Sequence, residues 1–98
     1  MAKALQSIDF QSQLDQLFCI HLDDATKIGL QLISVTELST ARSGFRDPFS
    51  LHFLGPVSQQ YLPQHTYPMV NETLGTFDIF IVPLGAEAGR MRYEAIFT

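Results

Sequence analysis

The sequence predicts a mainly β domain of the α+β class, with a short N-terminal helix packed on an antiparallel five- to six-stranded sheet or a partly closed barrel. Only the N-terminal segment shows helical spacing of its apolar residues. The remainder contains short β-prone runs in which apolar and polar residues alternate. Clusters rich in Gly, Pro, Asn and Asp separate these runs at short intervals, as in small sheets and barrels.

The segment Ser7–Phe18 predicts the helix. Its apolar residues follow the spacing i, i+4, i+7, i+8, which places them along one stripe of a short amphipathic helix. These residues are Phe10, Leu14, Leu17 and Phe18. The helix is expected to begin at Ser7 or Asp9, because either side chain can accept a hydrogen bond from a free backbone N–H of the first turn.

Two strands and a turn follow the helix. Phe18–Leu22 alternates with a period of two, Asp23–Thr26 is typical of a turn, and Lys27–Thr36 resumes as a strand, so a hairpin is predicted. Along the second strand, alternation places apolar residues on both faces. Ile28, Leu30 and Leu32 are expected on one face, with Ile33 and Val35 on the other.

The second half predicts further strands. Phe49–Leu54 alternates and is expected to end at Gly55–Pro56. Thr66–Val70 predicts a short strand in which Pro68 must lie at a sheet edge or bulge, because proline has no N–H. Three further segments complete the chain: a central strand at Phe77–Pro83 with apolar residues on both faces except Asp78, a loop at Leu84–Met91, and a strand at Arg92–Thr98 whose Tyr93, Ala95 and Phe97 share one face.

Composition indicates a single globular domain over residues 1–98. The chain is 46% hydrophobic and 16% charged, which argues against disorder. Its net charge of −4 argues against nucleic acid, which needs a basic surface. No apolar run approaches the ~20 residues that span a bilayer, so no membrane association is expected. The N-terminus lacks a signal peptide and Cys19 is the only cysteine, and we therefore expect a cytoplasmic protein.

Four segments between Phe49 and Phe97 carry a family resemblance. They are FSLHFLGP from Phe49, LPQHTY from Leu62, Leu74–Gly75 followed by FIVPLG from Phe80, and RYEAIF from Arg92. This pattern, FxLxFxGP, LPQxxY, LGxxxxFxVPxG and RYEAxF, resembles a family of small bacterial proteins known only as a domain of unknown function. The resemblance implies an association with phage-tail-like or other surface assemblies, and it implies no catalytic residues.

A small enzyme or ligand-binding barrel that uses His21, His52 and Cys19 is one interpretation of the polar residues. His21 and His52 each fall on the less apolar face of a strand, where they could be neighbours across a sheet. The histidines lack the spacing of a metal site, and no serine lies in a nucleophile elbow. Nothing cationic adjoins Cys19 in the sequence, as a reactive thiolate would require. We therefore expect no cofactor and no metal.

The favoured interpretation is a non-catalytic protein-binding or assembly module, with a protein partner or a second copy of the chain as its target. Exposed aromatic residues on loops commonly mark such contacts. The candidate binding residues lie on or beside two loops, Glu37–Pro48 and Leu84–Met91, and on the polar stretch between them: Arg42, Phe45, Arg46, Tyr61, Arg90 and Arg92. If the two loops meet, the arginines would form an anion-binding patch. The simpler expectation is that each arginine is solvated or pairs with Asp47, Glu87 or Glu94.

Overall fold

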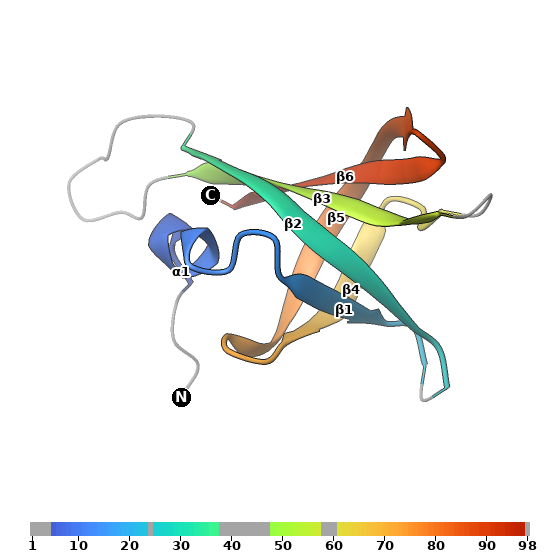
Figure 1. Cartoon of the computed structure of the whole chain (residues 1–98). Coiled ribbons are helices and arrows are strands. Elements are labelled where there is room, and N and C mark those ends of the chain that lie inside the picture. Colours follow the sequence, from blue (N-terminus) through green and yellow to red (C-terminus); the bar gives the residue numbers. More distant parts are fainter. Residues whose placement is uncertain (1–4, 24, 38–47, 58–60, 98) are drawn as a thin grey trace.

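The described part of the chain forms a six-stranded antiparallel barrel with one short helix (Figure 1). The computed structural model describes residues 5–23, 25–37, 48–57 and 61–97. The elements are α1 (Ser7–Gln11), β1 (Leu17–His21), β2 (Lys27–Glu37), β3 (Phe49–Val57), β4 (His65–Asn71), β5 (Gly75–Glu87) and β6 (Arg90–Phe97). The predicted mainly β fold with an N-terminal helix is confirmed. In the described part of the chain, no helix has the length and apolar character needed to cross a membrane.

The barrel closes in the order β1-β2-β3-β6-β5-β4, so β4 returns to pair with β1. This last ladder is short, with Cys19 opposite Val70 and Ile20 opposite Met69. Pro68 has a partner on β5, Asp78, but none on β1. It therefore lies where β4 is unpaired on one side, which agrees with the predicted edge position.

The core fills the barrel with side chains from alternate positions of every strand. Phe49, Leu51 and Phe53 of β3 are fully buried, and Tyr93 and Ala95 of β6 are almost so. The predicted alternation of these strands is confirmed. Because the inward positions of facing strands meet at the centre, one continuous apolar cluster forms inside the barrel.

A β-bulge in β2 changes the faces on which its residues lie. The pairing with β3 shifts between Leu32 and Ser34, so one extra residue is accommodated there. Val35 consequently pairs with Leu51 and packs against the core. The predicted placement of Val35 on the face opposite to Leu32 is wrong, because a bulge reverses the alternation beyond it.

The helix is shorter than its apolar stripe predicts. It ends at Gln11, while Leu14 and Leu17 are exposed and Leu17 already belongs to β1. Two backbone hydrogen bonds tie the connection to β2: Asp15 donates to the Leu32 carbonyl at 2.8 Å, and Leu32 donates to the Gln16 carbonyl at 3.1 Å. These bonds replace those of a longer helix.

The start of the helix also differs from the prediction. Its N-cap is Gln6, neither Ser7 nor Asp9. The Asp9 carboxylate accepts the Gln6 backbone N–H at 2.8 Å from its position in the first turn. This is the reciprocal contact of a capping box, in which the acidic residue lies three positions after the cap.

Two predicted strand ends are wrong. β3 continues through Gly55–Pro56 to Val57, with a register shift between Leu54 and Val57 that accommodates the proline. The predicted loop Leu84–Met91 is mostly strand, because β5 extends to Glu87 and β6 begins at Arg90. Only Ala88 and Gly89 form the turn, with φ values of 52° and 79° that are typical of a type I′ hairpin.

β5 has a neighbouring strand on each side, as predicted for a central strand, but only one of its faces is buried. It pairs with β4 and β6, and Ile79 and Ile81 point into the core. Phe80 lies between them and is 48% exposed. A six-stranded barrel has only one interior, so the outward side chains of β5 remain on the surface.

Candidate functional site

The two ends of the barrel differ in how they are filled. At one end, α1 places Phe10 inside the barrel, where it is fully buried. Its ring centroid lies 5.4 to 5.9 Å from those of Phe18, Phe49, Phe77 and Phe97. The helix therefore plugs this end of the barrel (Figure 1).

The opposite end carries a pocket of about 430 Å³. Its walls come from the end of β3, the starts of β2, β4 and β6, Leu22 directly after β1, and the segment before β4. The lining residues are Leu22, Ile28, Gly55, Pro56, Tyr61, Leu62, Pro63, Tyr67, Met91 and Tyr93. Ligand sites often occupy such a position, because the mouth of a barrel is where its interior reaches the surface.

Among the described residues that line this open-end pocket, none has a charged side chain. Its polar side-chain groups are tyrosine hydroxyls, and two of them bond within the pocket wall. The Tyr67 hydroxyl donates to the Pro63 carbonyl at 2.8 Å, and the Leu62 N–H donates to the Tyr93 hydroxyl oxygen at 2.9 Å. Burial raises the pKa of both Tyr67 and Tyr93 above the usual tyrosine value, so both phenols are uncharged near neutral pH.

The rim of the open-end pocket is apolar and exposed. Tyr61 is 58% exposed and Leu22 is 43% exposed, and both line the pocket. Tyr61 is a predicted binding residue that the structure places at this rim. Leu22, Pro56 and Met91 also line the pocket but are not among the predicted binding residues. Each lies near the end or start of a different strand, and no local sequence pattern shows that these strand ends meet.

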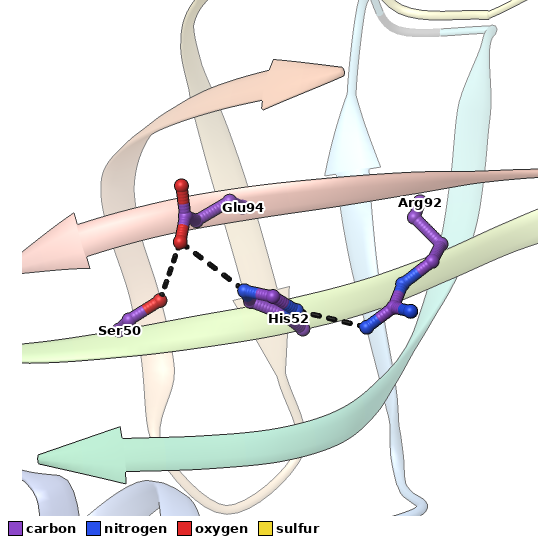
Figure 2. A network of polar contacts seen from close by, with 4 residues as sticks. All are labelled: Ser50, His52, Arg92 and Glu94. Atoms are coloured by element: carbon purple, nitrogen blue, oxygen red, sulfur yellow. Dashed lines mark hydrogen bonds and ion pairs between the residues drawn. The ribbon is translucent and has the colours of Figure 1, made fainter. Parts of the chain in front are cut away.

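A second polar arrangement lies on the outer face of β3 and β6 (Figure 2). The Ser50 hydroxyl donates to Glu94 Oε2 at 2.9 Å, and His52 Nε2 lies 3.1 Å from the same oxygen. Arg92 Nη2 lies 2.9 Å from His52 Nδ1. Because an arginine can only donate, Nδ1 must accept and the proton of the neutral imidazole must reside on Nε2.

This network is structural rather than a nucleophile with its base. In such a pair the serine hydroxyl would donate to the histidine, whereas here Ser50 donates to Glu94. Ser50 is also only 3% exposed. The network therefore joins two neighbouring strands through their outward side chains.

The two arginines of β6 have partners in the chain. Arg92 Nη1 lies 3.6 Å from Glu87, which is one of the predicted pairings, and the Arg92 Nε is buried without a partner among the described residues. Arg90 Nε donates to the Gly55 carbonyl at 2.7 Å, at the irregular end of β3. Of the other predicted binding residues, Arg42, Phe45 and Arg46 lie outside the described part of the chain.

The alternative site of His21, His52 and Cys19 is not assembled. Cys19 is opposite Gly29 on β2 and His52 is opposite Ser34. Gly29 and Ser34 are about 16 Å apart along the strand at ~3.3 Å per residue. His21 lies farther still, opposite Lys27. Within residues 5–23, 25–37, 48–57 and 61–97, no three His, Cys, Asp or Glu side chains gather as a metal site.

These observations define a small closed β-barrel that is plugged by a helix at one end and has an uncharged pocket at the other. The chain belongs to the family described as Domain of unknown function (DUF6916), whose model matches residues 5–97. The match includes the N-terminal half, beyond the Phe49–Phe97 segment that carries the resemblance. Comparisons with curated proteins and with solved structures found no match.

Proposed function

We propose that this protein is a non-catalytic binding module, and that its open-end pocket receives an apolar side chain of a protein partner. The observation that carries this proposal is the combination of an uncharged pocket of about 430 Å³ with an exposed apolar rim. Interfaces gain most of their binding energy where an aromatic or aliphatic side chain enters such a pocket.

The chemistry of the pocket supports contact rather than catalysis. The hydroxyls of Tyr67 and Tyr93 both take part in hydrogen bonds that hold the pocket wall. Because burial raises the pKa of both phenols, neither is suited to exchange protons near neutral pH. The pocket therefore offers shape and apolar surface.

The surroundings of the pocket extend the apolar surface. Val57, which directly follows the lining residue Pro56, is 78% exposed. Together with Tyr61 and Leu22 it gives this end of the barrel several large apolar side chains in contact with water. Exposed apolar patches of this kind commonly mark the sites at which a protein binds a partner. A place in a phage-tail-like or other multi-subunit assembly is consistent with this surface, and that assembly role is part of the proposal.

The test is site-specific photo-crosslinking in cells that produce the protein. The photoreactive amino acid benzoylphenylalanine replaces Tyr61 at the open end or, as a matched control, Ile8 on α1, which is 64% exposed. We expect a discrete cross-linked product from position 61 that is lost when Leu22→Asp is added, and no such product from position 8. A product that contains two copies of the chain would identify the partner as a second copy.

Two outcomes would contradict the proposal. One is the absence of any cross-linked product at position 61. The other is an identical set of products from positions 61 and 8, which would indicate random collision. The fold of each variant is checked by its thermal unfolding, so that a lost product is not confused with a lost structure.

A further inference from the structure

The open-end pocket has a chemical preference that its lining predicts. We infer that it selects an uncharged apolar side chain from a peptide segment, and that the Tyr93 hydroxyl donates a hydrogen bond to a backbone carbonyl next to that side chain. This inference rests on the proposed function, because it names the chemistry of the partner that enters the same pocket.

The absence of charge among the lining residues sets the first preference. A charged group that enters the pocket loses water and meets no opposite charge on any of the described lining side chains. Moving an ionised group into such surroundings is strongly unfavourable unless it is paired. An apolar side chain has no such cost and removes its own surface from water. The pocket therefore discriminates against acidic and basic side chains.

The hydrogen-bond pattern of the tyrosines sets the second preference. The Tyr67 hydroxyl uses its hydrogen on the Pro63 carbonyl. The Tyr93 oxygen instead accepts from the Leu62 N–H, and its own hydrogen has no acceptor among the described residues. Tyr93 and Leu62 both line the pocket, which places this donor in the pocket wall. A buried donor of this kind favours a ligand that brings an acceptor.

A peptide segment supplies both features at once. Each apolar side chain of a peptide is accompanied by a backbone carbonyl, which is a strong acceptor. The exposed Tyr61 and the prolines Pro56 and Pro63 present rigid apolar faces beside the pocket, against which a peptide backbone can lie. An isolated hydrocarbon would satisfy the apolar wall and leave the Tyr93 hydrogen without an acceptor.

The first experiment uses the unmodified protein and three probes that share a phenyl ring. N-acetylphenylalaninamide is uncharged, N-acetylphenylalanine is an anion, and phenethylamine is a cation at neutral pH. Binding is followed by NMR chemical-shift changes of Leu62 and Met91. We expect saturable binding of the uncharged probe and about tenfold weaker binding of each charged probe, which corresponds to ~1.4 kcal/mol. Equal affinities, or no binding of the uncharged probe, would overturn the inference.

The second experiment tests the donor. Tyr93→Phe removes the available hydroxyl, and Tyr67→Phe removes a hydroxyl that already has its acceptor in the chain. We expect N-acetylphenylalaninamide to bind about fivefold more weakly to Tyr93→Phe, in the range of one hydrogen bond, and within twofold of normal to Tyr67→Phe. Equal effects of the two variants would contradict a special role of Tyr93.

The two experiments separate this inference from the proposed function. Cross-linking from position 61 together with equal affinities of the three probes would leave the partner-binding role standing and remove the charge preference. Selective binding of the uncharged probe without cross-linking would support the pocket chemistry and count against a protein partner. The probe series requires no substitution, so it remains decisive even if Tyr93→Phe does not fold.

Discussion

At the scale of single residues, Glu94 lies within hydrogen-bond distance of two side chains on the outer face. One of its oxygens, Oε2, accepts from the Ser50 hydroxyl at 2.9 Å and lies 3.1 Å from His52 Nε2. The side chains of His52 and Glu94 are 26% and 30% exposed, whereas Ser50 is 3% exposed. If Glu94 is removed, water can therefore become the hydrogen-bond partner of His52 but not of the buried Ser50.

Removal of this acceptor should be more harmful than removal of the whole pair. We expect Glu94→Ala to lower the free energy of unfolding by about 1–3 kcal/mol, because the Ser50 hydroxyl is left buried and unpaired. The double variant Ser50→Ala/Glu94→Ala should be less destabilised than Glu94→Ala alone. Urea unfolding of the two variants and of Ser50→Ala gives the coupling free energy between Ser50 and Glu94. If the effects of the two single substitutions simply add, the hydrogen bond between these residues contributes nothing to stability.

The buried tyrosines predict how stability changes in alkali. Burial raises the pKa of Tyr67 and Tyr93 above the unfolded value of about 10. Above pH ~10 the unfolded chain releases these protons while the native chain retains them, so the free energy of unfolding falls as pH rises. Below the unfolded pKa the two phenols make no pH-dependent contribution.

Urea unfolding at a series of pH values above about 9 measures this slope. Tyr67→Phe should reduce the slope, because one of the two late-titrating phenols is removed. An unchanged slope in that variant would show that Tyr67 has the same pKa in the native and unfolded chains.

At the scale of the elements, the β5–β6 hairpin contains a residue that its turn does not favour. Ala88 has a φ of 52°, in the left-handed region where a non-glycine residue is strained. Asn tolerates this region better than Ala, and Asn-Gly is the preferred pair for this type of turn. Ala88 is exposed, so a longer polar side chain has room.

We therefore expect Ala88→Asn to raise the free energy of unfolding by about 0.5–1 kcal/mol. The matched control is Gly89→Ala, which places a Cβ at a φ of 79° and should destabilise the protein. Thermal unfolding of both variants checks the prediction. A loss of stability in Ala88→Asn would show that the backbone strain at Ala88 does not limit the stability of this hairpin.

The elements also show what the sequence could predict. The alternation of Phe49, Leu51 and Phe53 is local, because the two faces of a strand are set by neighbouring residues, and it predicted both the strand and its buried side. The bulge that turns Val35 inward depends on how β2 pairs with β3. That pairing joins residues far apart in the chain, so no local pattern reveals it.

The same difference between local patterns and long-range contacts limited the prediction of the helix end and of the pocket. The stripe from Phe10 to Phe18 satisfies helical spacing, yet Asp15 and Gln16 bond to Leu32 and end the helix early. The pocket draws its walls from four strands and two connections, and only Tyr61 among its residues stood out by its position in a polar stretch. A site built from the ends of many elements requires the topology before its members can be recognised.

At the scale of the whole molecule, the β1–β4 seam is where the barrel closes. Cys19 and Val70 are partners across it, and both are half-buried on alternate positions from the core residues Ile20 and Met69. Antiparallel partners have Cα atoms about 4.5–5.5 Å apart, within the range that a disulfide can bridge.

Val70→Cys should therefore form a disulfide with the natural Cys19 under oxidising conditions. We expect the bond to raise the free energy of unfolding by about 2–4 kcal/mol and to slow hydrogen exchange of the β1 and β4 amides. A reducing agent should abolish both effects, and Cys19→Ser/Val70→Cys is the control that cannot form the bond. Failure to oxidise would show that the seam does not hold these residues in register.

The plug formed by Phe10 has a consequence for any larger structure that contains this protein. Because one end of the barrel is occupied by the chain's own helix and the other carries the open-end pocket, the two ends differ, and the molecule has a head and a tail. Copies joined head to tail through a single contact would all point the same way, and such a contact generates a closed ring or an open filament according to its rotation. The geometry of the plug would then set the polarity of the assembly.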